Sequence, residues 1–172
     1  MTPRVMYTIG YEGATREELL GALMLAGVEV VIDTRETPTS RRPEFRRNTL
    51  RDALGREGIA YCSVPGLGVP KRLRPYARTH RGVFASAYLR RLRASGEAME
   101  ETLGLARGRA AALLCFESDE TQCHRSLLGT ELASLAPLAI THLRVRRCDN
   151  ADDEPRTPPV VRPEKKVQIA RG

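Results

Sequence analysis

The sequence predicts an α/β fold, a three-layer sandwich in which helices cover both faces of a mostly parallel, Rossmann-like sheet. Short β-branched apolar runs alternate with amphipathic segments along the chain, and turn residues separate them. The central runs are apolar enough to be buried on both faces, as strands of parallel sheets are. Right-handed crossovers return each strand beside its neighbours, so this alternation favours parallel pairing.

The first part of the chain predicts strands at 6–10, 28–32 and 59–64, with helices at 15–27 and 49–58 between them. The first strand is short and apolar. Thr15 and Glu18 have the spacing of a capping box for the helix that follows, and Gly27 ends that helix. The second strand is a β-branched run. The second helix carries Leu50 and Leu54 inward and stops before the third strand.

The second part predicts helices at 83–94, 97–106 and 124–135 and strands at 110–116 and 140–145. Apolar residues recur at three- and four-residue spacing from Phe84 onward, and the last helix has a leucine face that ends before Pro137. We expect residues 1–148 to form a single domain. Residues 149–172 are rich in proline and charge, and we expect a mostly disordered tail there.

Composition limits the class of protein. The 172 residues include four Cys and no Trp, and no window of about 18 apolar residues predicts a membrane span. The N-terminus lacks the pattern of an export signal and the cysteines are too few for a disulfide scaffold, so we expect a cytoplasmic protein. No Walker or Gly-x-Gly-x-x-Gly motif follows the first strand, which disfavours ordinary mononucleotide hydrolysis and dinucleotide redox chemistry. The sequence identifies no cofactor and no oligomeric state.

The net charge of +7 is distributed unevenly. Residues 35–93 hold 14 Arg and Lys71 against four acidic residues, so this third of the chain carries +11 and the rest carries −4. Its loop 40–47 places Phe45 among four arginines, which suits gripping a phosphate backbone or stacking a base. The segment indicates a phosphorylated small molecule or a nucleic acid as partner. The alternative explanation is that codon usage favours arginine and that these side chains form only a solvated surface.

Polar residues follow the predicted strands at the carboxyl edge of the sheet, where α/β proteins bind ligands, so we expect the carboxylates and the run 123–125 to share one cleft. The candidate catalytic residues are Glu12, Asp33, Glu117, Cys123 and His124, and the candidate phosphate or ligand contacts are Tyr11, Arg35, Arg41, Arg42 and Arg125. The carboxylates could serve as general acid and base, as nucleophile, or as partners of a ribose hydroxyl or a divalent cation. Ion pairing with Arg35 and Arg125 is their alternative, structural role.

Cys123 is the most specific candidate for a catalytic residue. A helix that begins near Cys123 and the charge of Arg125 would lower the pKa of its thiol. The alternative is that Cys123 has no reactive role and packs as a small buried side chain. His124 could be a base or a helix cap. Arg125 in a first helical turn opposes the helix dipole, so we expect it to face an anion or a buried carboxylate.

Zinc binding fits the sequence less well. Cys115, Cys123, His124 and Cys148 supply enough ligand atoms for one ion. No Cys-x-x-Cys pair is present, however, and Cys115 falls inside a predicted apolar strand. No metal site is therefore predicted.

Four motifs occur in a characteristic order. They are Tyr7–Gly13 (YTIGYEG), Ile32–Arg35 (IDTR) with the loop 38–45, Pro65–Gly68 (PGLG), and Leu114–Glu117 (LCFE) with Cys123-His124-Arg125. Together they resemble the uncharacterised bacterial family DUF488, from about Tyr7 to Leu135, with Thr34 where the family more often has Val. The resemblance implies an α/β fold and a shared set of polar positions. It implies no reaction.

Three candidate functions follow from these observations. The first is an enzyme that hydrolyses or transfers a group at a base, glycosidic or phosphate centre of a nucleotide or nucleic acid, with the strand-end residues as its site. The second is a thiol-dependent enzyme with Cys123 as covalent nucleophile. The third is a non-catalytic module that binds nucleotides or nucleic acid through the basic surface.

Overall fold

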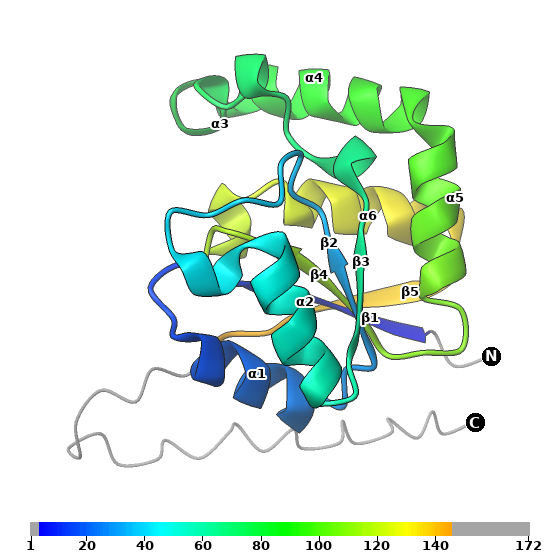
Figure 1. Ribbon diagram of the computed structural model, residues 1–172. Coiled ribbons are helices and arrows are strands. Elements are labelled where there is room, and N and C mark those ends of the chain that lie inside the picture. The colour runs from blue at the N-terminus through cyan, green and yellow to red at the C-terminus, as the bar shows by residue number, and fades with distance from the viewer. Residues whose placement is uncertain (1–3, 146–172) are drawn as a thin grey trace, which may run out of the picture.

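A five-stranded parallel sheet forms the centre of the molecule. The computed structural model describes residues 4–145, so the predicted tail at 149–172 lies outside the described residues. The strands are β1 (Arg4–Gly10), β2 (Val30–Asp33), β3 (Ala60–Ser63), β4 (Ala111–Cys115) and β5 (Leu138–His142), in the order β3-β2-β4-β1-β5. Helices cover both faces of the sheet (Figure 1). The predicted α/β class with a parallel sheet between two helical layers is confirmed.

Six α-helices are found between residues 4 and 145. They are α1 (Arg16–Leu25), α2 (Arg47–Arg56), α3 (Tyr76–Thr79), α4 (Arg81–Ala94), α5 (Gly96–Leu105) and α6 (Arg125–Leu135). The predicted order of long elements is found, and the capping box of Thr15 and Glu18 is formed at the start of α1. The four-residue α3 was not predicted, because its segment has no apolar periodicity. No helix in this part of the chain is long and apolar enough to cross a membrane.

The strand order places β4 between β2 and β1, unlike the order 3-2-1-4-5 of common dinucleotide-binding folds. α1 and α2 pack on one face of the sheet, and α4, α5 and α6 pack on the other. The connection that leaves β1 therefore turns to one face, and the connection that leaves the neighbouring β4 turns to the opposite face. Such divergence at the carboxyl ends of two adjacent strands is the place where α/β sheets form a ligand crevice.

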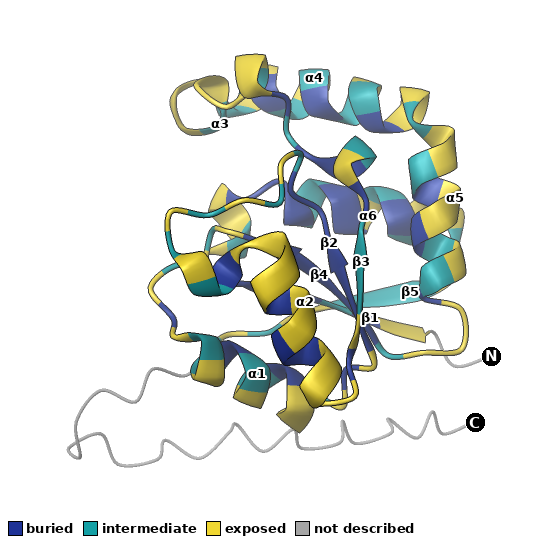
Figure 2. Ribbon diagram, in the orientation of Figure 1, coloured by how far each residue is buried: buried dark blue, intermediate teal, exposed yellow. Residues whose placement is uncertain are grey.

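Side chains of the central strands alternate between two cores, and both cores are buried in Figure 2. In β4, Ala111 and Leu113 belong to the core beneath α4–α6, whereas Ala112 and Leu114 belong to the core beneath α1 and α2. Successive side chains of a strand point to opposite faces. The next residue, Cys115, therefore belongs to the α6 side of the sheet.

Gly10, the last residue of β1, lies against the connection that follows β4. A Cβ at this position would overlap the carbonyl oxygen of Glu117 and would lie 3.0 Å from Nη2 of Arg125. The close approach fixes where the β4–α6 connection crosses the end of β1. Any larger residue must push that connection away.

Replacing Gly10 with Ala should therefore destabilise the protein by about 1–3 kcal/mol, the usual cost of overpacking a closed site. Gly21→Ala is the matched control, because Gly21 lies within α1 and an added Cβ there meets no atom within 4 Å. That variant should be neutral or more stable by up to about 1 kcal/mol, since Ala favours helix over Gly. Urea unfolding monitored by circular dichroism measures both. Equal midpoints for the two variants would contradict the close contact.

Candidate functional site

The ten residues predicted from the sequence lie in four separate places. Glu117, Cys123, His124 and Arg125 meet in a buried cluster; Tyr11, Asp33 and Arg35 form a buried network; Glu12 lines a cavity; and Arg41 and Arg42 lie on the loop that follows β2. All four places are near the carboxyl edge of the sheet. From the sequence we expected one shared cleft, which the described residues do not form.

Asp33 and Arg35 form a buried ion pair on the α1–α2 side of the sheet. The carboxylate of Asp33 is fully buried and accepts from Nε and Nη2 of Arg35 and from the hydroxyl of Tyr61 at 2.6 Å. Arg35 also donates to the hydroxyl of Tyr11 at 2.9 Å and to the carbonyl of Phe45 at 3.0 Å. The ring of Tyr11 stacks on that of Phe45, with centroids 4.2 Å apart.

These contacts satisfy the network internally. Burial disfavours the charge of Arg35, but the hydrogen bonds and attraction of Asp33 outweigh it and raise the pKa of the guanidinium. Burial and the neighbouring Asp33 also raise the pKa of Tyr61. Asp33 is fully buried and Arg35 only 7% exposed, so neither offers a free group to a ligand. The geometry assigns this network to stability, holding the loop after β2 against the sheet.

Breaking this pair should be costly. Asp33→Asn should destabilise the protein by about 3–5 kcal/mol, because it leaves the buried charge of Arg35 without its counter-ion. Asp52→Asn removes one partner of the exposed pair Arg51–Asp52 and should cost less than about 1 kcal/mol. Urea midpoints at pH 7 measure the difference. A loss for Asp33→Asn no greater than for the control would contradict a buried pair.

A second group of polar side chains, here called the thiol cluster, consists of Cys115, Glu117, Cys123 and His124. Oε2 of Glu117 lies 3.0 Å from Sγ of Cys115 and 3.2 Å from Sγ of Cys123. Nδ1 of His124 lies 3.6 Å from both sulfurs. Cys115 ends β4, Glu117 follows it, and Cys123 and His124 immediately precede α6. Strand alternation places Cys115 on the α6 side, so the two segments meet.

Arg125 is the cation of this site. Its side chain is 1% exposed, and Nε lies 3.2 Å from Sγ of Cys123. Its other nitrogens donate to the hydroxyl of Thr8 and to the carbonyl oxygen of Glu117. The sequence led us to expect an anion or a buried carboxylate beside Arg125. The partners found are a thiol sulfur, a hydroxyl and a backbone carbonyl.

The charges in the thiol cluster shift one another's pKa values. Burial opposes ionisation of Cys123, but its contacts with Cys115 and His124 and the charge of Arg125 lower the pKa of its thiol. The hydrogen bond to Cys123, together with burial, raises the pKa of Cys115. Burial and the negative Cys123 raise the pKa of Glu117. Both sulfurs lie in closed surroundings, at 5% exposure for Cys115 and 1% for Cys123.

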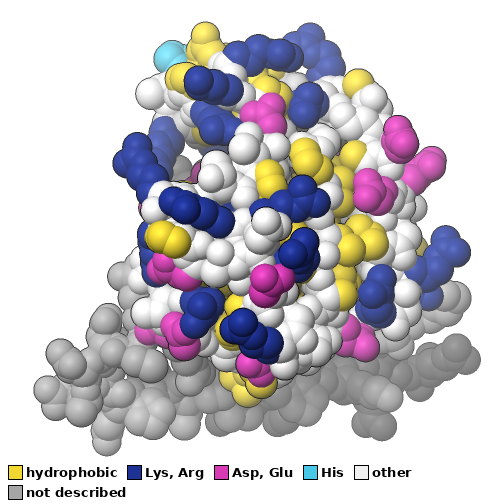
Figure 3. Space-filling model, in the orientation of Figure 1, with side chains coloured by type: hydrophobic (Ala, Val, Ile, Leu, Met, Phe, Trp, Pro, Cys, Tyr) yellow, Lys and Arg dark blue, Asp and Glu magenta, His cyan; other side chains and the backbone are white. Residues whose placement is uncertain are grey.

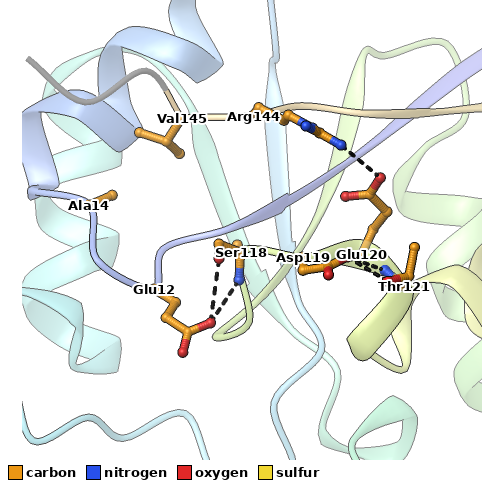
Figure 4. Close-up of a pocket in the computed structure, with 9 residues that line it drawn as sticks. Glu12, Ala14, Ser118, Asp119, Glu120, Thr121, Arg144 and Val145 are labelled. Carbon is orange, nitrogen blue, oxygen red and sulfur yellow. Dashed lines mark hydrogen bonds and ion pairs between the residues drawn. The ribbon is translucent and has the colours of Figure 1, made fainter.

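A cavity of about 490 Å³ lies where the connections from β1 and β4 diverge. Its lining is drawn in Figure 4 and comprises Gly10, Glu12, Ala14, Ser118, Asp119, Glu120, Thr121, Arg144 and Val145. One carboxylate oxygen of Glu12 accepts from the amide and the hydroxyl of Ser118, at 3.2 and 3.4 Å. Arg144 forms an ion pair with Glu120 at 3.6 Å. The thiol cluster does not line this cavity, although Glu117 directly precedes Ser118.

The basic loop after β2 borders the same region. Arg42 donates to the carbonyl of Ala14 at 2.6 Å, pairs with Glu44, and lies over the ring of Phe45. Arg41 is exposed and has no side-chain partner among the described residues. Arg42 therefore lies at the rim of the cavity, beside Ala14, and Arg41 lies in solvent.

The motifs can now be compared with those of known proteins. The family model described as "Domain of unknown function DUF488" matches residues 15–132, more than half of the chain. The chain belongs to the DUF488 family. No curated protein and no solved structure matches it. The DUF488 match includes the whole thiol cluster and the buried pair Asp33–Arg35, and it begins after Glu12.

Three residues at the site were not among the candidates predicted from the sequence. Cys115 was considered as a zinc ligand and set aside because it falls inside a predicted strand, and it is the last residue of β4. Thr34 was noted only as a departure from the DUF488 pattern, and its hydroxyl contacts Nε2 of His124 at 3.2 Å. Arg81 begins α4 and donates to the carbonyl of Cys123 at 3.3 Å. Counting alternate positions along β4 would have placed Cys115 on the α6 side, but no local signal identifies Arg81.

Proposed function

We propose that this DUF488 protein is an enzyme that acts on a nucleotide or nucleic acid by hydrolysis or group transfer, with substrate bound in the cavity between β1 and β4. The cavity carries the proposal. It lies at the position where α/β sheets bind ligands, and about 490 Å³ is within the usual range for ligand pockets.

The lining suits a ligand that has both hydroxyl or amino groups and phosphate. One oxygen of Glu12 is held by Ser118, which fixes the carboxylate and leaves its second oxygen to accept from a ribose hydroxyl or a base amine. Arg144 in the lining and Arg42 at the rim provide guanidinium groups for a phosphate. Glu12 is also the carboxylate best placed to act as general acid or base.

A nucleophilic role for Cys123 has less support. A covalent nucleophile must reach the reacting atom of its substrate. Sγ of Cys123 is enclosed by Glu117, His124 and Arg125, and the residue is 1% exposed. We therefore do not assign the covalent step to this thiol.

The surface charge supports a phosphate-rich substrate. Residues 58–96 contain eight basic side chains and no acidic one. In Figure 3, Lys and Arg gather over α3 and α4, and a group of Asp and Glu lies over α5. Over the region of η1 (Pro43–Phe45) and α2, Arg side chains lie among Asp and Glu. Most of these arginines are exposed. This distribution favours a binding surface over arginines scattered evenly by codon usage.

The cavity hypothesis predicts an effect of Glu12 on nucleotide binding. At least one of the four ribonucleoside 5′-monophosphates should bind the purified protein, as measured by calorimetry, and Glu12→Gln should weaken that binding by about tenfold through loss of a charge-assisted hydrogen bond. Glu57→Gln, at an exposed position at the end of α2, removes the same charge outside the cavity and should leave the affinity unchanged. Failure of all four nucleotides to bind, or an equal loss in both variants, would refute the cavity as their site.

Polyanion binding can be tested by comparing two variants that each lose four arginines, at opposite edges of the sheet. Replacing Arg41, Arg42, Arg46 and Arg47 with Gln should weaken oligonucleotide binding and flatten its salt dependence, by a log–log slope of about 0.7–0.9 for each phosphate that is no longer neutralised. The control replaces the exposed Arg4, Arg56, Arg107 and Arg109, which lie toward the amino edge of the sheet. Fluorescence anisotropy across salt concentrations compares the two. An identical effect of both quartets would indicate attraction by net charge rather than a surface at the carboxyl edge.

A further inference from the structure

We propose that the thiol cluster is a zinc site, in which Sγ of Cys115, Sγ of Cys123, Nδ1 of His124 and a carboxylate oxygen of Glu117 hold one Zn²⁺. These four atoms lie within 4.8 Å of one another. Zinc in proteins takes four ligands of these chemical types in tetrahedral geometry. The inference does not depend on the proposed enzyme activity, because it concerns a different set of side chains from the cavity lining.

Four distances between ligand atoms are close to the edges of a zinc tetrahedron. With Zn–S bonds of about 2.3 Å and Zn–N or Zn–O bonds of about 2.0–2.1 Å, the edge between a sulfur and a nitrogen or oxygen is about 3.5–3.6 Å. Nδ1 of His124 lies 3.6 Å from each of the two sulfurs. The carboxylate oxygen lies 3.0 and 3.2 Å from them, so it must move by only about half an ångström to reach such an edge.

The hydrogen bonds fix the histidine in the tautomer that a metal requires. The hydroxyl of Thr34 has one hydrogen, which it donates to the carbonyl of Leu114 at 2.9 Å. Its contact with Nε2 of His124 at 3.2 Å is therefore a bond in which the imidazole donates. Nδ1 then carries the lone pair, and it faces both sulfurs. Such an outer hydrogen bond orients most metal-binding histidines.

Zinc would also balance the charge of the cluster. Metal binding requires deprotonated ligands, and two thiolates and one carboxylate then carry −3. Among the described residues, Arg125 is the one arginine or lysine with a hydrogen bond to a ligand atom of this set. A dication brings this set to neutral, which a buried site requires because an uncompensated charge there is costly. Arg125 then acts as an outer partner, with its Nε donating to the sulfur of Cys123.

The donor set also selects the metal. Two thiolates and an imidazole favour zinc over magnesium or calcium, which bind through oxygen ligands. All four ligands come from the protein, and three of them are buried, as in closed structural sites. Glu117 is half-buried, so the carboxylate is the ligand that solvent reaches most readily.

The test uses the full chain purified from zinc-supplemented cells. We expect one equivalent of zinc after dialysis, measured by mass spectrometry of the metal. Cobalt(II) added to the chelator-treated protein should give a thiolate charge-transfer absorption and the intense visible bands of a tetrahedral site. This readout needs no variant, so it is independent of any folding defect. Absence of zinc together with a weak octahedral cobalt spectrum would overturn the proposal.

Variants identify the ligands. Cys123→Ser and His124→Ala should weaken zinc binding by more than about 100-fold in a chelator competition, and Thr34→Val should weaken it by about 10–100-fold while leaving all four ligands in place. Cys62→Ser is the matched control, because Cys62 lies on β3 as a free, half-buried cysteine outside the cluster. It should bind zinc as the unmodified protein does. Unchanged affinity in Cys123→Ser, or an equal loss in Cys62→Ser, would place the metal elsewhere.

Discussion

The two-residue alternation of side chains along the central strands decides on which side of the sheet the polar groups at the strand ends lie. These strands are buried on both faces, so each position must belong to one core or the other. The side chain of Asp33 lies on the same face as that of Val31, toward α1 and α2, whereas those of Thr34 and Cys115 lie on the side of α6. One edge of the sheet therefore carries two polar sites, separated by the sheet itself.

The two sites satisfy their charges differently. Asp33 and Arg35 neutralise each other, and the hydroxyls and a carbonyl around them complete their hydrogen bonds, so that network is closed. The thiol cluster combines three acidic groups with a histidine whose free lone pair faces the sulfurs. A closed network of the first kind anchors a loop. A cluster of sulfur, nitrogen and carboxylate oxygen atoms that converge on one point suits the binding of a cation.

Much of the fold could be predicted from the sequence because its signals are local. The capping box at Thr15, the β-branched run at 28–32 and the leucine face of α6 each depend on a few neighbouring residues. The sequence predicted that the site residues lie at the carboxyl edge of the sheet, but it did not predict which of them are in contact. The approach of Cys115 to Cys123 depends on the path of the β4–α6 connection. The standard zinc spacing has two close cysteines. Here seven residues separate them, and their approach requires tertiary packing.

The cavity and the thiol cluster are joined through one short piece of backbone. Glu117 belongs to the cluster, and Ser118, the next residue, holds the carboxylate of Glu12 in the cavity. Gly10 brings β1 against the carbonyl of Glu117, and Arg125 binds that same carbonyl from the cluster side. A metal that fixed Glu117 would thereby fix the position of Ser118 and, through it, the orientation of Glu12. The buried site can thus order the ligand-binding surface without contacting the ligand, as groups that support an active site do.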